Sequence, residues 1–255
     1  MSNSASAQAG MRIDDALRRM ADLPARDFAD LGIRRLLVVA PHPDDESLGC
    51  GGLIAAACAV GFPVTIMVVS DGTGSHPNSS AYPADRLRQV RESETLAAAA
   101  ELGVAPGDVP FLRLPDRFVP TAGPEADAAV LAITSTARSM GADTIAVTWQ
   151  HDPHCDHQAA HALVTRAARD LPQVRVLAYP IWGLSRPAHE RISEKEISGF
   201  RLIIGEHRAA KRRAVAAHAS QITALIDDDP DGFRLTAEDL ARFDRPHEIF
   251  LGAAP

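Results

Sequence analysis

The chain has 255 residues, of which 46% are hydrophobic and 23% charged, with a net charge of −7. This length allows one large α/β domain with a full core, and the composition is that of an ordinary globular protein. The negative charge argues against nucleic acid and anionic membrane surfaces as partners. No uninterrupted apolar run reaches the roughly 18 residues of a transmembrane helix, so membrane insertion is not expected.

The first residues and the cysteines indicate where the protein works. The N-terminus lacks the charged region and apolar block of a secretory signal. The three cysteines Cys50, Cys58 and Cys155 are an odd number without CxxC spacing, which argues against a disulfide framework and fits a reducing compartment. A cytoplasmic location is therefore expected.

Hydrophobic spacing predicts the elements in chain order. Residues 1–30 are expected to form an N-terminal extension, disordered over 1–10 and helical over 13–23. Residues 31–255 are expected to form a single α/β domain. Its predicted strands are 34–40, 63–70, 109–114, 143–149 and 174–181, and the helices between them are 51–61, 85–103, 125–141 and 157–171.

These strands are continuous apolar runs without polar alternation. Such strands, alternating with helices, predict a mostly parallel sheet with helices on both faces. After residue 182 the pattern is less regular, with a strand expected over 200–205 and a helix over 206–226. We interpret this region as a C-terminal elaboration of the same domain.

Polar residues follow four consecutive predicted strands, at 42–46, 71–80, 115–117 and 150–157. In open α/β sheets, ligands bind beyond the carboxyl ends of the strands. The four strand exits are therefore expected to face one crevice.

Two of these exits carry sets of metal-binding side chains, HPDD at 42–45 and HCDH at 154–157. Zinc takes histidine nitrogen and carboxylate oxygen ligands, and catalytic sites use three protein ligands. A cation between the two turns would relieve the repulsion among the adjacent acids. Either cluster alone could be a set of helix-capping residues, but the pair in one crevice favours a metal site.

The same residues carry a resemblance to a known family. The stretch APHPDDESLGCGG and the later HCDH resemble the HPDDE and HxDH motifs of the PIG-L/LmbE-like family of zinc-dependent N-acetylglucosamine deacetylases. RESE at 91–94 and AHASQ at 217–221 are similar to further family segments, so the resemblance covers roughly 34–225. It implies a Rossmann-like fold, in agreement with the strand pattern.

The resemblance also implies a set of zinc ligands and a general base. It implies that His42, Asp45 and His157 are the zinc ligands and that Asp44 is the general base. Zinc would activate water at neutral pH, and an adjacent carboxylate would accept its proton. Glu46 is expected to be structural, although a catalytic role stays open.

Further roles follow from the resemblance at the second cluster and beyond it. His154, in its protonated form, would stabilise the tetrahedral intermediate, with Asp156 hydrogen-bonded to it as the orienting group. Arg91 and Asp116 match positions that hold substrate hydroxyls, and His218 and Gln221 are expected to approach the substrate from the C-terminal region. An ordinary surface arginine and a packed helix histidine are the alternatives for Arg91 and His218.

Four residues near the second cluster stay open. His161 lies one helical turn after His157 and could be a ligand or a packing residue. His151 and Asp152 could line the pocket or belong to a solvated loop, and Asp152 stands where family members that act on sugar conjugates can carry a tyrosine. Cys155 is expected to be close to the site without acting as a nucleophile.

Together these features predict a zinc hydrolase that removes an N-acyl group, expected to be acetyl, from an amino-sugar conjugate. Another divalent transition metal is compatible with the ligand set. One alternative is a zinc amidase or esterase acting on a non-sugar acyl compound, and another is a metal-free α/β protein that binds a small molecule without cleaving it. The glycines GCGG at 49–52 weakly suggest dinucleotide binding, without GxGxxG spacing. The expected partner is a small molecule, and a homo-oligomer is left open.

Overall fold

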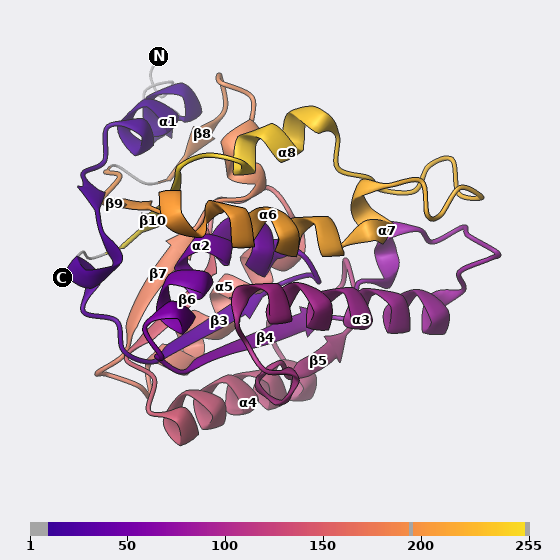
Figure 1. The fold of residues 1–255 in the computed structure, drawn as a ribbon, viewed down its shortest axis with the longest axis horizontal. Helices are drawn as coiled ribbons and strands as arrows, with labels where there is room; N and C mark the ends of the chain where they lie inside the picture. The colour runs from indigo at the N-terminus through magenta and orange to yellow at the C-terminus, as the bar shows by residue number, and fades with distance from the viewer. Residues whose placement is uncertain (1–9, 194–195, 253–255) are drawn as a thin grey trace, which may run out of the picture.

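The computed structural model describes residues 10–193 and 196–252 (Figure 1). Residues 1–9, where disorder is predicted, lie outside the described residues. Among the described helices none is long and apolar enough to cross a membrane. A small antiparallel pair, β1 (Met11–Arg12) and β8 (Arg191–Ile192), lies apart from the main sheet.

The main sheet of the described chain has eight strands in the order β2-β9-β10-β7-β6-β3-β4-β5. Neighbours from β7 to β5 are parallel, as are β2 and β9, whereas β10 is antiparallel to both its neighbours. The mostly parallel α/β architecture is therefore confirmed. The strands are β2 (Ala25–Arg26), β3 (Leu36–Ala40), β4 (Val64–Ser70), β5 (Phe111–Leu114), β6 (Thr144–Thr148), β7 (Arg175–Tyr179), β9 (Gly199–Ile203) and β10 (His247–Leu251).

Helices cover both faces of this sheet, and short 3-10 turns join them to the strands. The α-helices are α1 (Ile13–Ala21), α2 (Asp45–Ala59), α3 (Ala84–Leu102), α4 (Pro124–Met140), α5 (Cys155–Ala168), α6 (Arg208–Ala217), α7 (Ala219–Ile222) and α8 (Ala237–Phe243). The 3-10 turns are η1 (Phe28–Leu31), η2 (Thr73–Ser75), η3 (Pro106–Asp108), η4 (Trp182–Ser185) and η5 (Gly205–His207).

Strand β3 shows why the strands lack polar alternation. All five of its residues are buried. Leu36 and Val38 pack into the core under α2, α3 and α6, while Leu37 and Val39 pack into the core under α4 and α5. Because both pleat faces are covered, truncating a leucine such as Leu37 to alanine should cost about 2–5 kcal/mol.

Helix α2 begins at Asp45, six residues before the predicted start at 51. Two acids, Asp45 and Glu46, therefore lie in its first turn, where the helix dipole stabilises negative charge. Its glycines serve close packing. A Cβ at Gly49 would overlap the Tyr179 ring, and one at Gly52 would overlap the Ile204 side chain. Packing therefore accounts for these glycines without a bound dinucleotide.

The C-terminal region differs from the prediction. The expected helix over 206–226 is two helices, α6 and α7, which are separated at His218. Strand β10 was not predicted, and it inserts between β7 and β9. At the other end of the chain, Ile13 and Met20 of α1 pack into one core cluster with Trp149 of the β6 exit.

Candidate metal centre and active site

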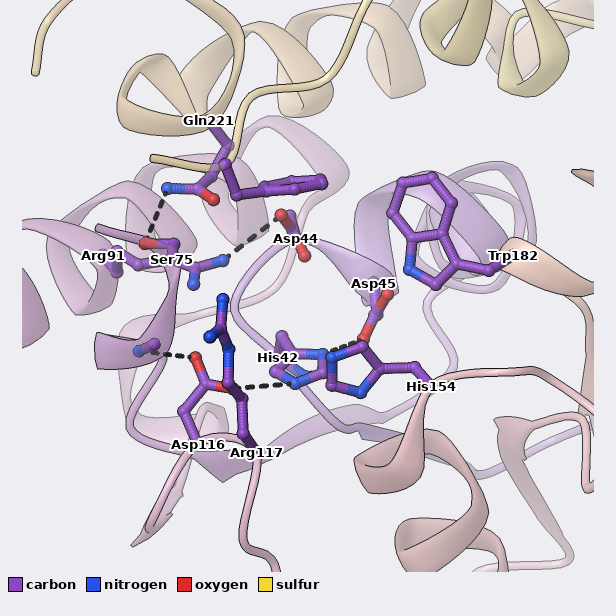
Figure 2. A pocket seen from close by; sticks show the side chains of 12 residues that line it. His42, Asp44, Asp45, Ser75, Arg91, Asp116, Arg117, His154, Trp182 and Gln221 are labelled. Carbon is purple, nitrogen blue, oxygen red and sulfur yellow. Dashed lines mark hydrogen bonds and ion pairs between the residues drawn. The ribbon is translucent and has the colours of Figure 1, made fainter. Parts of the chain in front are cut away.

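The four polar strand exits meet in one pocket at the carboxyl end of the sheet, as expected (Figure 2). The β3–α2 turn contributes His42, Asp44 and Asp45, the β5 exit contributes Asp116, and the β6 exit contributes His154. The β4 exit contributes Gly74 and Ser75 of η2 to the wall of the pocket. The topology therefore brings together side chains that are more than 100 positions apart in the sequence.

Three potential ligand atoms form a compact triangle at the base of this pocket. Nδ1 of His42, Oδ2 of Asp45 and Nε2 of His157 lie 3.2 Å from one another. Ligands that bind zinc tetrahedrally at about 2.0–2.1 Å lie about 3.3 Å apart. The three side chains are buried. The predicted ligand set therefore fits a single tetrahedral cation, with its fourth position left for another group.

The protonation of these groups is consistent with a cation site. Burial disfavours charge on His157, yet the neighbouring Asp45 and Asp152 carboxylates raise its pKa to about 9. The pKa of His42 is raised well above its ordinary value, because contacts with Asp116, Asp156 and Asp45 outweigh burial. The pKa of Asp45 is lowered against its burial by the two imidazoles. The carboxylates therefore hold positive charge between the rings, which a cation would supply.

Asp152, which the sequence left open, lies behind His157. It is fully buried, and its Oδ1 is 3.2 Å from Nδ1 of His157. The two atoms are close enough for an ion pair, but they are not aligned for a hydrogen bond. Its Oδ2 accepts hydrogen bonds from the backbone N–H groups of Ile181 and Gly183, at 2.8 and 3.1 Å. Asp152 therefore supports the outer side of a ligand ring rather than lining the pocket.

Asp156 and Asp116 both face the other nitrogen of His42. Nε2 of His42 lies 3.1 Å from Oδ2 of Asp156 and 3.3 Å from Oδ1 of Asp116. The Asp156 carboxylate also accepts hydrogen bonds from the backbone N–H groups of Arg117 and Val119. In place of the expected hydrogen bond from His154, the Asp156 carboxylate makes these contacts, so Asp156 supports His42 instead.

His154 is held by a backbone group. Its Nδ1 accepts a hydrogen bond of 3.2 Å from the backbone N–H of Asp156 at the start of α5. A nitrogen that accepts carries no proton, so the neutral ring bears its hydrogen on Nε2. Burial and the nearby His42 and His157 lower the His154 pKa to about 4. Both observations disfavour the expected protonated form, and a neutral ring of this tautomer can donate through Nε2.

Asp44 has a strained backbone, with φ of 139°. Such values are rare for residues other than glycine and cluster at functional sites. Its backbone N–H donates to Oε2 of Glu46 at 3.0 Å, and its carboxylate lies 3.2 Å from Nη2 of Arg91. Burial raises the Asp44 pKa to about 7, although Arg91 opposes that rise. A carboxyl group with this pKa is suited to general base catalysis near neutral pH.

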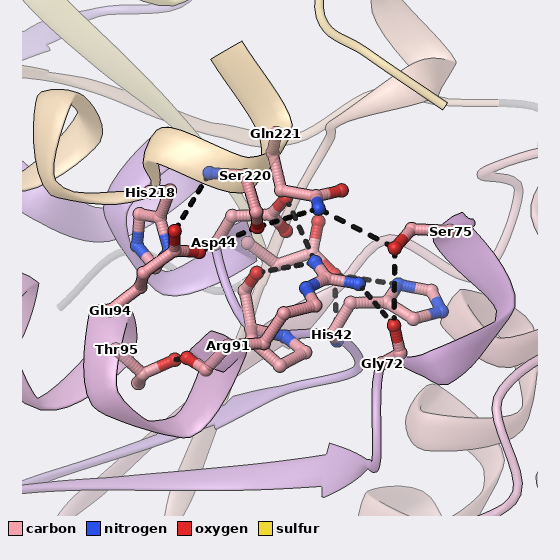
Figure 3. A network of polar contacts seen from close by, with 12 residues as sticks. His42, Asp44, Gly72, Ser75, Arg91, Glu94, Thr95, His218, Ser220 and Gln221 are labelled. Carbon is pink, nitrogen blue, oxygen red and sulfur yellow. Dashed lines mark hydrogen bonds and ion pairs between the residues drawn. The ribbon is translucent and has the colours of Figure 1, made fainter. Parts of the chain in front are cut away.

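Arg91 lines the pocket, but its terminal nitrogens are engaged. Nη1 donates to the carbonyl oxygen of Gly72 at 2.8 Å, and Nη2 donates to that of Pro43 at 2.6 Å and to Asp44. The guanidinium therefore ties the β3–α2 turn to the β4 exit (Figure 3).

Behind the β3–α2 turn lies a buried polar network that includes His218 (Figure 3). Nε2 of His218 is 3.0 Å from Oε1 of Glu46 and 3.3 Å from the hydroxyl of Ser47. His218 does not line the pocket, in contrast to the expected approach to substrate. Three positions later, Gln221 does line it. The Gln221 Nε2 donates to Ser75, and its buried Oε1 has no hydrogen-bond partner among the described residues.

Two aromatic residues at the pocket wall, Trp182 and Phe233, were not predicted. Their rings meet edge to face with centroids 5.8 Å apart. Of the residues left open, Cys155 is exposed beside Asp156, and Nδ1 of His161 lies 2.9 Å from the carbonyl oxygen of Thr148. Among the described residues, His161 does not belong to any group of three histidine, cysteine or acidic side chains whose potential ligand atoms lie within 4.8 Å of one another.

Curated deacetylases are similar to this chain in sequence. A curated relative from Actinosynnema mirum, a 1D-myo-inositol 2-acetamido-2-deoxy-alpha-D-glucopyranoside deacetylase, is 28% identical over 76% of this chain and 82% of its own. A probable N-acetyl-alpha-D-glucosaminyl L-malate deacetylase 2 from Bacillus subtilis is 28% identical over 75% of this chain and 85% of its own.

Solved structures share the fold. The N,N'-diacetylchitobiose deacetylase from Pyrococcus horikoshii matches with a TM-score of 0.61 and 17% identity, covering 86% of this chain and 83% of that one. The conserved protein TT1542 from Thermus thermophilus matches with a TM-score of 0.55 and 27% identity, covering 74% and 80%. The family model described as GlcNAc-PI de-N-acetylase matches residues 37–168, more than half of the chain. The chain therefore belongs to the PIG-L family of deacetylases, which are amide hydrolases.

Proposed function

We propose that the protein is a zinc-dependent hydrolase that removes the acetyl group from the amino sugar of an N-acetylglucosaminyl conjugate. The observation that carries this proposal is the triangle of His42, Asp45 and His157 beside the strained carboxylate of Asp44. Relatives named for N-acetylglucosaminyl inositol and N-acetylglucosaminyl malate support the sugar part of the substrate.

His42, Asp45 and His157 would hold the cation through the three atoms that lie 3.2 Å apart. When bound, zinc supplies Lewis acidity to the amide carbonyl and to the attacking water. The donor set, two imidazoles and one carboxylate, is typical of catalytic zinc sites.

Asp44 accepts the proton of the attacking water in this proposal. The C–O bond forms at the amide carbon, and Asp44 then returns the proton to the departing nitrogen as the C–N bond breaks. The products are acetate and the free amine of the sugar. The position of Asp44 is fixed by Arg91 on its carboxylate and by Glu46 on its backbone N–H, so little rearrangement is needed.

His154 donates its Nε2 hydrogen to the developing oxyanion. Because the Asp156 backbone N–H occupies Nδ1, the ring needs no change of tautomer for this role. Asp116 lines the pocket and can accept a hydrogen bond from a sugar hydroxyl. Gln221 offers a buried Oε1, which has no hydrogen-bond partner in the described part of the chain, as a further acceptor for such a hydroxyl.

The test is a turnover assay on the zinc-loaded protein. N-acetylglucosaminyl conjugates are compared with simple N-acyl amides and with esters, before chelation, after chelation and after zinc readdition. Turnover of the sugar conjugates that is lost on chelation and regained with zinc is expected. Preferential turnover of simple amides or esters would favour the non-sugar hydrolase, and binding of conjugates without turnover or stoichiometric metal would favour the binding protein.

One solved structure makes this assay necessary. GalB from Pseudomonas putida KT2440, a 4-carboxy-2-hydroxymuconate hydratase, matches the fold with a TM-score of 0.55 and 21% identity. The fold alone therefore does not determine the reaction. The deacetylase proposal is supported by the family and by the side chains of the site, and release of acetate is the measurement that distinguishes it.

A further inference from the structure

Arg117 is a pocket residue that the proposed chemistry does not use. Its side chain points into the pocket beside Asp116 and His42 (Figure 2). The other arginine that lines this pocket, Arg91, is engaged by two carbonyl oxygens and Asp44. No described residue makes a hydrogen bond or ion pair with the guanidinium of Arg117. Arg117 therefore offers a free, permanently positive fork of donors to whatever enters the pocket.

The backbone of Arg117 is held in an unusual conformation, with φ of 69°. Its N–H donates to Oδ2 of Asp156 at 2.6 Å, and its carbonyl oxygen accepts from Sγ of Cys155 at 3.4 Å. Because Asp156 also contacts His42, the site itself fixes the place where the arginine side chain starts. A left-handed conformation at a residue other than glycine is strained and persists only where the surroundings impose it.

A close approach to Gly74 keeps the path of the side chain open. A Cβ at Gly74 would lie 3.2 Å from Cγ of Arg117 and 3.0 Å from the carboxyl group of Asp116. Both side chains thus pass along the bare backbone of η2 into the pocket. The position of Arg117 is therefore set by contacts with Gly74 at the β4 exit and with Asp156 at the β6 exit.

The opposite wall of the pocket is aromatic. Trp182 lies across from Arg117 in Figure 2, and Phe233 meets it edge to face. The Phe233 backbone N–H donates to the carbonyl oxygen of Ser75 at 2.7 Å, which joins its loop to η2. Asp229 strengthens this junction by accepting from the backbone N–H of Asn78 at 2.9 Å. A ligand that enters the pocket would therefore lie between the aromatic rings of Trp182 and Phe233 on one side and the guanidinium of Arg117 on the other.

We propose that Arg117 binds an anionic group on the aglycone of the substrate, a carboxylate or a phosphodiester. This inference rests on the proposed function, because the acetamido end of the conjugate must be at the metal for the aglycone to reach Arg117. The carboxylates of Asp44 and Asp116 are already engaged by Arg91 and His42, so the free positive charge is left for the ligand. A planar guanidinium can bind either anion through two parallel hydrogen bonds. A neutral polyol aglycone would leave the exposed guanidinium to solvent.

The experiment compares three N-acetylglucosaminyl conjugates on the zinc-loaded protein: a malate, an inositol and an inositol phosphodiester. The variant is Arg117→Gln, and the control is Arg113→Gln. Arg113 lies in β5, shortly before Arg117 in the chain, and also has a positive φ, of 56°, but its exposed guanidinium pairs with Glu92. The measured quantity is the ratio of kcat/KM for each anionic conjugate to kcat/KM for the neutral inositol conjugate.

In the wild type one anionic conjugate is expected to be preferred over the neutral inositol conjugate. Preference for the malate conjugate would identify a carboxylate as the bound group, and preference for the inositol phosphodiester conjugate would identify a phosphodiester. Arg117→Gln should reduce the preference about 10- to 100-fold, as expected for the loss of a charge-assisted hydrogen-bond pair. Arg117→Lys should restore part of it, and Arg113→Gln should leave it unchanged. An equal loss for anionic and neutral conjugates, or no preference in the wild type, would overturn the inference.

A binding measurement separates this inference from the deacetylase proposal. If none of the three conjugates is hydrolysed, the proposed function fails, and calorimetric titration of the same conjugates then decides the role of Arg117. Tighter binding of an anionic conjugate that is lost in Arg117→Gln would support it. Equal binding of all three by both proteins would contradict it.

Discussion

Asp152 and His157 form a buried pair in which Oδ1 of the carboxylate lies 3.2 Å from Nδ1 of the imidazole. The opposite nitrogen of the same ring lies 3.2 Å from Asp45. One histidine is therefore placed between two carboxylates, one in the ligand triangle and one behind it. Because the backbone of Ile181 and Gly183 holds the other oxygen of Asp152, the carboxylate is fixed independently of any cation.

The first prediction concerns metal affinity. Asp152→Asn keeps the shape of the side chain but removes the charge that orients His157 and increases its basicity. The zinc dissociation constant should therefore rise about 10- to 100-fold, as for other partners of ligand histidines. Competition with a chromophoric chelator measures it. Asp127→Asn, which removes an exposed acid paired with Arg166, is the control for net charge. Unchanged zinc affinity in Asp152→Asn would show that the pair does not support the ligand.

The contrast between Asp152 and Asp45 shows what a sequence can predict. Asp45 belongs to a short motif whose ligands lie on one turn, so its role follows from local spacing and the resemblance. The contacts of Asp152 depend on a turn after β7, about 30 residues later, and on the register of β6 beside β7. A polar residue after a strand predicts a place at the carboxyl edge of the sheet, but not which neighbour its carboxylate will contact.

The second prediction concerns the pH dependence of turnover. Asp44 must be deprotonated to act as a base, so kcat/KM should rise as the pH increases through its pKa. Burial raises this pKa and Arg91 opposes the rise, so Arg91→Met should raise the pKa further. The low-pH limb of the profile should therefore move to higher pH, apart from any loss in maximal rate.

Profiles of kcat/KM against pH for the zinc-loaded proteins check this shift. The control is Arg88→Met on the same helix, where the arginine pairs with the exposed Asp85. A bound cation would lower the Asp44 pKa in both proteins, so the comparison depends on the difference between them. A limb that stays in place or moves to lower pH in Arg91→Met would argue against Asp44 as the titrating base.

The third prediction concerns stability. His218 and Glu46 are buried with Nε2 and Oε1 3.0 Å apart, so His218→Ala leaves Glu46 buried without its partner. Breaking a buried pair in this way costs about 3–5 kcal/mol of unfolding free energy. Burial lowers the His218 pKa, but Glu46 outweighs burial and the net shift is upward. The contribution is therefore fully present below the unfolded pKa of about 6.5 and is lost as the pH rises through the folded pKa.

Urea unfolding at pH 6 and at pH 9 measures this difference. The destabilisation by His218→Ala should be larger at pH 6, and the exposed His189→Ala should show no such dependence. An equal loss at both pH values would indicate that packing, rather than the ion pair, accounts for the effect of His218.

The C-terminal half of the site could not be predicted as well as the strand exits. His218 and Gln221 were both expected near the substrate, because AHASQ resembles a family segment within a region that was predicted to be one continuous helix. The helix instead ends at Ala217, and Gln221 faces the pocket while His218 lies behind the β3–α2 turn. The aromatic wall formed by Trp182 and Phe233 belongs to irregular segments, whose sequences have no periodicity that indicates an orientation. The local motifs and the family resemblance therefore predicted which three side chains form the triangle, whereas the wall formed by Trp182 and Phe233 was not predicted.

The last prediction concerns the protons that zinc displaces. The pKa of His157 is raised to about 9, and that of His42 is raised as well, so the metal-free site holds extra protons at neutral pH. Zinc binds the neutral imidazoles, so binding must release these protons, and zinc affinity should rise between pH 6 and pH 9. Calorimetric titration at pH 7 in buffers with different ionisation enthalpies should report the release of about one to two protons per zinc. Zinc binding without proton release would mean that the rings are already neutral, and that Asp45 and its neighbours do not hold positive charge between them.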